Sequence, residues 1–537
     1  MLKDLARSLS LTNLCFMAVW PQLISQSLNP QAQYARYRFN GYVAILINVL
    51  ALTFIFWITI TLIRRYGNEK TMKVARWAFL LFLILPVHAV IKTQMPAFAI
   101  NSPDFFFGSI KRILVSVLLI APVAFLLFRF HAYLVKFFSI ALLVMCPFAF
   151  WTLGKSVYLM TRFADKPSPP ITAASGEVSP RILWLIFDEM DQRIAFAERP
   201  PGLLLPELDR LRDESVYASN AYPPSTQTLM SLPALISGRL VSSAYVASPS
   251  DLLLTFDESE DRVNWSDQPN IFSEARKLGR NTALVGWYHP YPRMIGDNLN
   301  YCVFEDNKEL PLSLTLLNQL RDAAASLPML SGMSNFEDME FAGLRKGEEG
   351  RRRYRADMYQ RMMNEALKFA TDPEIGVALV HWPVPHAPVI YNRHKQDFKW
   401  GKGTSYMDNM ALVDRALGEL RREMESKGIW EKTIVLVTSD HPLRPKNWED
   451  RLTGVDETEA ELISRKADPR IPFVLKLAGQ KHGALYDKEF NTVLTQDLFL
   501  ALLNGEISTA ESVSDWMDKN RSIGESPYRK RSKSARP

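Results

Sequence analysis

Apolar residues are concentrated at the start of the chain, where they form long uninterrupted runs. Residues 42–63 hold no charged side chain over 22 positions, enough for a helix to cross a bilayer core of roughly 30 Å. Shorter runs at 77–91, 113–128 and 137–154 are flanked by Lys or Arg, whose side chains can reach the membrane interface. The pattern predicts a transmembrane domain over residues 1–155 with four or five helices.

The fifth candidate helix is residues 8–29, which carry no charge but include Asn13, Pro21 and Gln22. This segment is either a membrane span or a helix lying in the interface. We do not expect a cleaved signal peptide here, because a charged region, a short apolar core and a small-residue cleavage site do not occur in that order.

Basic residues in the short loops predict the orientation, because cytoplasmic loops are enriched in Lys and Arg. One loop holds Arg64, Arg65, Lys70, Lys73 and Arg76, and the loop at 129–136 holds Arg129 and Lys136. Lys111 and Arg112 favour the opposite orientation more weakly. We therefore expect a multi-pass protein of the cytoplasmic membrane whose residues beyond 155 lie outside the cytoplasm.

Beyond the helices the pattern changes to short apolar runs that alternate with amphipathic segments, which is typical of a mostly parallel sheet covered by helices on both faces. The domain boundaries follow: a Pro- and Ser-rich linker at 156–180, an α/β domain at 181–505, and a basic, disordered tail at 506–537. The expected strands are Ile182–Phe187, Thr282–Val285, Ile375–His381, Ile434–Thr438 and Ile471–Leu477. The expected helices are Leu205–Glu214, Arg352–Ala370, Tyr406–Lys427 and Thr492–Leu503.

Composition narrows the function classes. The net charge of +6 lies mostly in the membrane-flanking loops, so nucleic-acid binding is not indicated. Cys15, Cys146 and Cys302 are too few and too far apart for a disulfide scaffold or a cysteine metal site.

Ligands in this kind of sheet bind beyond the carboxyl ends of the strands, where acidic residues and histidines collect in this chain. Asp188 and Glu189 follow the first strand, His381 and His386 the third, and Asp440 with His441 the fourth. Such oxygen and nitrogen ligands suit a divalent Zn or Mn ion. A single acidic residue after a strand is also a common helix N-cap. The prediction of a metal site therefore depends on such residues occurring at the ends of three strands.

Four segments, in this order, resemble the alkaline phosphatase/sulfatase superfamily, and within it the membrane-anchored phosphoethanolamine and phosphoglycerol transferases, including the lipoteichoic acid synthases. They are IFDEMDQ, TQTLMSLPALISGR, HWPVPHAP and TSDH. The resemblance implies Thr228 as nucleophile and metal ligand, with His386 and His381 on the substrate side. It implies that Asp188, Glu189, Asp440 and His441 hold the metal, with Glu189 the better match to the acidic ligand.

The resemblance further implies the reaction: transfer of a phospho-headgroup from a phospholipid donor to a glycan or glycolipid hydroxyl, through a threonine-bound intermediate. A threonine hydroxyl is a poor nucleophile at neutral pH, and a bound metal ion would activate it. Thr228 could instead be a helix N-cap, and Thr226 and Ser225 are rival nucleophiles.

Three departures from the family pattern stand out. Pro442 replaces the usual glycine after the Asp-His pair, residues 442–470 contain no histidine, and Cys302 is too isolated to form the disulfides common in phosphoethanolamine transferases. Arg444 or Lys446 could hold a phosphate in place of the missing histidine. His289 is a candidate for the substrate pocket. The remaining histidines are assigned no role at the site: His88, His131, His394 and His482.

Three alternatives stay open at this point. A phosphodiesterase or phosphatase of the same fold would transfer to water. A type I sulfatase would need a Cys or Ser that is oxidised to formylglycine, and threonine cannot supply it. A non-catalytic membrane scaffold would keep the fold without turnover.

Overall fold

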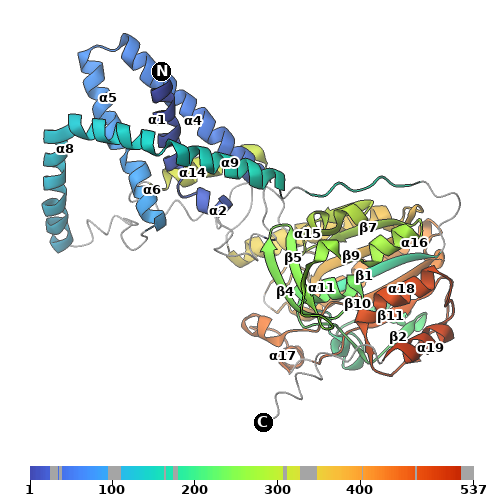
Figure 1. Cartoon of the computed structure of the whole chain (residues 1–537). Helices are drawn as coiled ribbons and strands as arrows, with labels where there is room; N and C mark the ends of the chain where they lie inside the picture. The colour runs from blue at the N-terminus through green and yellow to red at the C-terminus, as the bar shows by residue number, and fades with distance from the viewer. Residues whose placement is uncertain are drawn as a thin grey trace. The chain divides into compact units, whose positions relative to one another are not determined.

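The structure is a computed structural model in which the chain forms two compact units (Figure 1). The helical unit comprises 1–29, 36–164 and 308–343, and the sheet unit comprises 30–35, 165–307 and 344–537. The residues that the structure describes are 1–24, 34, 39–94, 110–162, 165–172, 180–305, 311–326, 347–401, 403–465 and 468–521.

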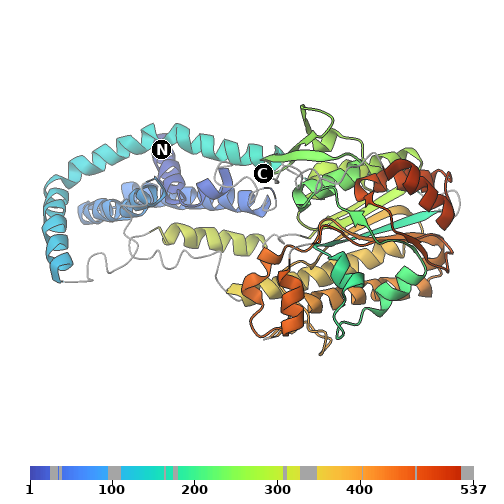
Figure 2. The ribbon, with the colours of Figure 1, turned by 90° about the horizontal axis from the view of Figure 1, so that it is seen from below.

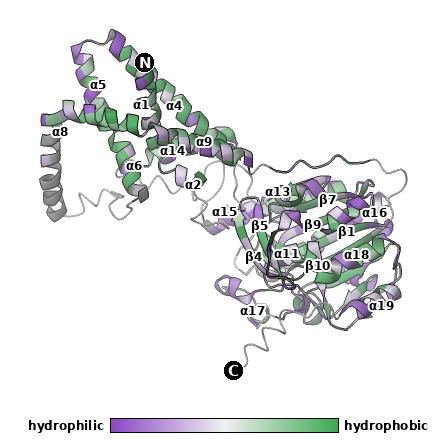
Figure 3. Cartoon of the chain, viewed as in Figure 1, coloured by the Kyte–Doolittle hydropathy of each residue, from purple (hydrophilic) through white to green (hydrophobic). Residues whose placement is uncertain are grey.

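The helical unit is built from apolar helices, and hydrophobic residues predominate along them (Figure 3). Within the described residues, three segments are long and apolar enough to cross a membrane: Phe39–Tyr66, Glu69–Ile91 and Phe128–Arg162. The helices are α1 (Leu2–Cys15), α2 (Trp20–Ile24), α4 (Phe39–Tyr66), α5 (Glu69–Phe82), α6 (Ile84–Gln94), α8 (Ile110–Val144), α9 (Cys146–Arg162) and α14 (Leu312–Ala324).

Two features of this unit correct the expected spans. The segment 129–136 is not a loop but part of the continuous helix α8, because it contains no glycine or proline and carries its two charges at its ends. The described part of 8–29 is not one helix: α1 ends at Cys15, and Pro21 stands in the first turn of α2, where proline favours a helix start. Residues 25–29 lie outside the described residues.

A helix from the second half of the sequence belongs to the helical unit. Helix α14 packs on α4, where Asn48 Nδ2 donates to Gln319 Oε1 at 3.2 Å and to the Leu316 carbonyl at 3.1 Å. Gln319 Nε2 in turn donates to the Gly41 carbonyl at 2.8 Å. These contacts lie at the N-terminal half of α4, the half opposite its basic C-terminal turn.

The sheet unit contains an eight-stranded sheet in the order β12-β2-β11-β10-β1-β9-β7-β8. Strand β11 runs antiparallel to both neighbours, and the other adjacent pairs are parallel. The strands are β1 (Arg181–Asp188), β2 (Val216–Ala218), β7 (Asn281–Gly286), β8 (Tyr301–Phe304), β9 (Ile375–Pro385), β10 (Thr433–Ser439), β11 (Phe473–Lys476) and β12 (Ala484–Tyr486).

Helices cover both faces of this sheet (Figure 2). Alternate residues of β1 enter two separate cores, with Leu185 and Phe187 on one face and Trp184 and Ile186 on the other. The first core is closed by α10 (Pro206–Asp213), α15 (Gly347–Ala370) and α16 (Tyr406–Ser426). The second is closed by α11 (Thr228–Ser237), α12 (Ile271–Lys277), α18 (Thr495–Leu503) and α19 (Ala510–Asn520).

The five expected strands are confirmed as β1, β7, β9, β10 and β11, and the mostly parallel α/β fold is confirmed with them. Two of the domain boundaries expected from the sequence differ from those in the structure. Helix α9 continues to Arg162, inside the expected linker. Helix α19 lies inside the expected disordered tail, because Thr509 caps it and Val513 and Met517, one turn apart, are buried in the core. Residues 522–537 lie outside the described residues.

Candidate active site

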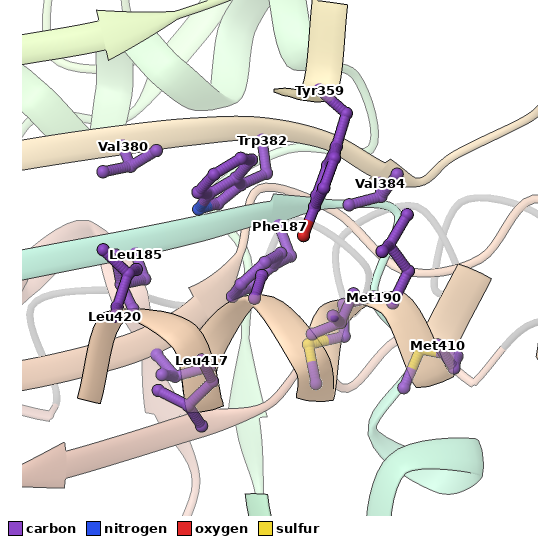
Figure 4. Close-up of a cluster of buried hydrophobic side chains, with 14 of the residues drawn as sticks. Leu185, Phe187, Met190, Tyr359, Val380, Trp382, Val384, Met410, Leu417 and Leu420 are labelled. Carbon is purple, nitrogen blue, oxygen red and sulfur yellow. The ribbon is translucent and has the colours of Figure 1, made fainter. Parts of the chain in front are cut away.

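Two consecutive acidic residues end the central strand β1, and their side chains take different directions. The strand end is fixed by Phe187, whose ring stacks on Trp382 with centroids 6.1 Å apart (Figure 4). Asp188 and Glu189 are both buried. Glu189 has φ of +70°, in the left-handed region that residues other than glycine rarely occupy, at a cost of about 1–3 kcal/mol. This turn separates the two carboxylates.

The neighbouring strand β10 brings an aspartate and a histidine beside Asp188. Phe187 is aligned with Ser439, so the residues that follow both strands meet at one edge. His441 Nε2 lies 3.2 Å from Asp188 Oδ1 and 3.6 Å from Asp440 Oδ2. Asp440 Oδ1 accepts hydrogen bonds from the backbone amides of Glu189 and His441 at 3.3 and 2.9 Å.

Thr228 joins this group from the first turn of α11. It is the first residue of the helix and is 4% exposed. Its side chain lies close enough to the Asp440 carboxylate to lower the pKa of Asp440. A helix N-terminus carries partial positive charge and free amides, so negative charge that develops at this hydroxyl is stabilised.

The three residues Asp188, Asp440 and His441 have the chemistry of a metal site. One ligand atom from each lies within 4.8 Å of the others. His441 Nδ1 is 2.9 Å from the Pro442 carbonyl, which can only accept, so Nδ1 carries the proton and Nε2 presents its lone pair. Both Asp188 carboxylate oxygens and Asp440 Oδ2 are buried without a hydrogen-bond partner in the described chain. These lone pairs repel one another unless a cation lies among them, so the site fits a divalent metal ion.

The electrostatics of the site agree with this assignment. Burial alone lowers the pKa of His441, but the Asp440 and Asp188 carboxylates outweigh burial and raise it to about 9. Burial and the Asp188 charge raise the pKa of Asp440 above its ordinary value. Burial acts to raise the pKa of Asp188 as well, but the imidazoles of His386, His441 and His381 lower it overall. Without a metal, a proton on His441 supplies the missing positive charge.

Glu189, which the family resemblance implied as a ligand, is not in this group of three. Its carboxylate accepts hydrogen bonds from the Arg444 amide at 3.0 Å, and from Arg444 Nε, Asn447 Nδ2 and Trp448 Nε1 at 3.3 Å each. Glu189 thereby anchors the loop that follows Pro442. No pattern in the sequence points to Asn447 and Trp448, because loop contacts of this kind have no fixed spacing.

The histidine in β9, His381, and the histidine directly after this strand, His386, lie close to the site. His381 is buried, its Nδ1 meets the Tyr291 hydroxyl at 2.9 Å, and its Nε2 has no hydrogen-bond partner in the described chain. His386 is half-buried, and its Nδ1 donates to the Ala387 carbonyl at 2.7 Å, which leaves Nε2 for a substrate. Both imidazoles act electrostatically on Asp188.

The other two substrate-side candidates differ in their surroundings. Arg444 has a half-exposed side chain, and its Nη2 lies 3.0 Å from His441 Nε2. His289 is fully buried beside Thr228, where its Nε2 meets the Thr228 carbonyl at 3.1 Å and its Nδ1 meets the Tyr34 hydroxyl. Both ring nitrogens of His289 are therefore engaged within the protein rather than facing a substrate.

Residues 180–504 match the family described as Sulfatase. The chain belongs to this family. The resemblance inferred from the four sequence segments is thereby confirmed, and the matched range coincides with the expected α/β domain. No curated protein matches the chain.

Solved structures similar to this sulfatase-family chain are distant from it. Lipoteichoic acid synthase LtaP from Listeria monocytogenes is 14% identical over 61% of this chain and 72% of its own, with a TM-score of 0.39. Phosphonate monoester hydrolase SpPMH from Silicibacter pomeroyi is 13% identical over 60% and 73%, with a TM-score of 0.39. The sulfatase PsFucS1 from Pseudoalteromonas sp. is 17% identical over 61% and 69%, with a TM-score of 0.40.

The raised pKa of His441 leads to a prediction about metal binding in the sulfatase-family domain. The metal must displace the proton from Nε2, so the apparent affinity of the site for the metal should fall about tenfold for each pH unit below about 9.

The stability of the metal-free protein should change in the opposite direction. Protonated His441 stabilises the metal-free fold fully below the unfolded pKa of about 6.5, and this stabilisation is lost as pH rises through about 9. Stabilisation by added Mn²⁺ or Zn²⁺ should therefore increase from pH 6.5 to 9 in thermal unfolding. If the stabilisation by metal in thermal unfolding did not change with pH, the assignment of His441 as a metal ligand would be contradicted.

Proposed function

We propose that the protein is a membrane-anchored, metal-dependent transferase. It moves a phosphoethanolamine or phosphoglycerol headgroup from a phospholipid to a glycan or glycolipid hydroxyl, through a covalent intermediate on Thr228. The observation that carries the proposal is the position of Thr228, at a helix N-terminus and beside Asp440, which forms the candidate metal group with Asp188 and His441. The apolar helices of the same chain favour a donor that resides in a membrane.

We assign the metal to Asp188, Asp440, His441 and the Thr228 hydroxyl, with Zn or Mn as the ion that suits these ligands. When bound, the ion would lower the pKa of the Thr228 hydroxyl and offset charge on the phosphoryl oxygens. Asp440 lies beside that hydroxyl and would take its proton.

The reaction consists of two displacements. In the first, Thr228 Oγ bonds to phosphorus while the bond from phosphorus to the diacylglycerol oxygen breaks, and that oxygen takes a proton from His386. In the second, the acceptor hydroxyl gives its proton to His386 and bonds to phosphorus. The bond to Thr228 Oγ then breaks, and Oγ regains its proton from Asp440.

A positive donor at the site would hold the phosphoryl group. Arg444 offers a guanidinium, which pairs well with phosphate oxygens, and its half-exposed side chain leaves it accessible. His381 does not serve as a second donor, because its Nδ1 lies 3.1 Å from the Trp287 carbonyl and therefore carries the proton, which leaves Nε2 with a lone pair. We propose that Arg444 takes the place of the missing family histidine.

A lipid assay with the full chain tests the proposal. The protein is reconstituted with Mn²⁺ or Zn²⁺ in vesicles of phosphatidylethanolamine or phosphatidylglycerol, and diacylglycerol release is measured with an EDTA control. Diacylglycerol with the headgroup on a glycolipid acceptor is the expected result. Diacylglycerol with a free phospho-headgroup would instead make the protein a hydrolase. No metal-dependent release from either lipid would contradict the proposed donor.

We also propose that the sheet unit lies outside the cytoplasm. Arg64 and Arg65 end α4, and Arg64 pairs with Asp4 at 2.6 Å, which places the basic end of this helix with the start of α1. Helix α14 binds the opposite half of α4. The positive-inside rule then puts α14 on the outer side.

Cysteine labelling in intact cells tests this orientation. Glu69→Cys lies at the exposed start of α5, and Ser426→Cys lies on the exposed end of α16. A membrane-impermeant maleimide should label S426C and leave E69C unlabelled until the membrane is opened, with the unsubstituted chain as background control. Labelling of E69C alone in intact cells would reverse the orientation.

A further inference from the structure

A tyrosine from the stretch between two helices of the helical unit lies inside the sheet unit. Tyr34 falls between α2 and α4 in sequence, yet it belongs to the sheet unit and is only 2% exposed. Its hydroxyl lies 2.7 Å from His289 Nδ1, and its ring stands edge-on to that imidazole with centroids 5.8 Å apart. Its backbone carbonyl accepts from Arg293 Nη2 at 2.9 Å. Tyr34 is therefore held by both its side chain and its backbone.

His289 connects Tyr34 to the residue proposed as nucleophile. The Thr228 carbonyl, 3.1 Å from His289 Nε2, can only accept, so Nε2 must carry a proton and donate it. In a neutral imidazole with its proton on Nε2, the other ring nitrogen, Nδ1, accepts. The Tyr34 hydroxyl is then the donor to Nδ1. The three groups form one chain of hydrogen bonds with a single direction, from Tyr34 through His289 to Thr228.

We infer that Tyr34 is a positioning residue for Thr228, supplied by the segment that precedes the first long apolar helix. This role rests on the proposed function of Thr228. Tyr34 selects the His289 tautomer that donates to the Thr228 carbonyl, and that bond holds the first residue of α11 in place. Because the direction of the Thr228 hydroxyl depends on its backbone, a small displacement there weakens the alignment for attack.

The position of Tyr34 in the chain has a structural consequence. A sheet unit cut from the chain after the apolar helices lacks Tyr34, and His289 Nδ1 is then left buried without its donor. The site is complete only when the N-terminal segment is seated. Turnover thereby depends on the attachment of the sheet unit to its membrane anchor, beyond the effect of local lipid concentration.

Kinetics of the full chain in lipid vesicles test this role. Y34F removes only the hydroxyl and should lower kcat about tenfold, with KM within twofold of the unsubstituted enzyme. Y245F, at a 55% exposed tyrosine of the same unit, is the matched control and should have no effect. H289Q should lower kcat similarly, and the Y34F/H289Q double variant should be no slower than the slower single variant. Equal kcat for Y34F and Y245F would overturn the inference.

Hydrogen exchange separates this inference from the proposed function, because it requires no turnover. In Y34A, peptides covering residues 227–232 and 287–293 should exchange at least about tenfold faster, whereas Y34F should leave them protected. If the unsubstituted enzyme releases no lipid product but Y34A shows this change, the proposed function fails and the contact stands. Unchanged exchange in Y34A would overturn the placement of Tyr34 itself.

Discussion

Replacement of Thr228 by alanine is expected to reduce kcat by about 10⁴–10⁶-fold, the range seen when a covalent nucleophile is removed. The reason is geometric as well as chemical. Thr228 is the first residue of α11 and lies beside Asp440, so its removal leaves no hydroxyl at the position from which phosphorus would be attacked. The measurement is metal-dependent diacylglycerol release by the full chain.

Conservative variants serve as controls for this prediction. Thr228→Ser keeps a hydroxyl at the same position and should retain measurable turnover, because the nucleophile is preserved. Ser225→Ala and Thr226→Ala should stay within about tenfold of the unsubstituted enzyme, since neither residue belongs to the proposed ligand group. Full activity in T228A, or loss of activity in T226A alone, would move the nucleophile elsewhere. A scaffold protein would keep its cellular role in T228A.

The neighbouring acidic residues at the end of β1 should respond differently to loss of charge. Asp188→Asn removes a buried carboxylate that has no hydrogen-bond partner in the described chain and faces His441. The affinity of the D188N variant for Mn²⁺ or Zn²⁺ should be at least about 100-fold lower than that of the unsubstituted protein, and turnover should fall in parallel. Titration calorimetry measures the first effect without any need for a substrate.

Glu189→Gln is the matched variant, one residue away. Its carboxylate accepts from Arg444, Asn447 and Trp448, so the variant should keep metal affinity within a few-fold. It should lose about 1–3 kcal/mol of stability through weakened charge-assisted hydrogen bonds. If E189Q lost the metal and D188N kept it, the ligand assignment drawn from the structure would be reversed, in favour of the residue that the family pattern matched better.

The sheet and its edge could be predicted because each depends on local sequence. Buried parallel strands read as continuous apolar runs, and the residues after them must meet at the carboxyl edge. The apolar runs alone therefore predict that Asp188, Glu189, Asp440 and His441 lie at one edge, and the structure groups all of these except Glu189. Thr228 required the family resemblance, since a threonine at a helix start has no distinguishing pattern of its own.

The remaining features depend on contacts that sequence spacing does not encode. The positive φ of Glu189 turns its carboxylate away from Asp188, and nothing in the segment IFDEMDQ indicates that turn. Tyr34 is separated from His289 by 255 positions in the chain. The contact of His289 with the Thr228 carbonyl, the packing of α14 on α4 and the burial of α19 in the second core are likewise long-range contacts.

Intact-mass spectrometry of the full chain tests the central claim most directly. The protein, with all residues including Tyr34, is incubated with Mn²⁺ or Zn²⁺ and either phosphatidylethanolamine or phosphatidylglycerol, then quenched in acid during turnover. We predict a mass increase of one phospho-headgroup with one of the lipids, absent from T228A. The absence of any increase during measurable turnover, or an increase that persists in T228A, would contradict the covalent threonine intermediate.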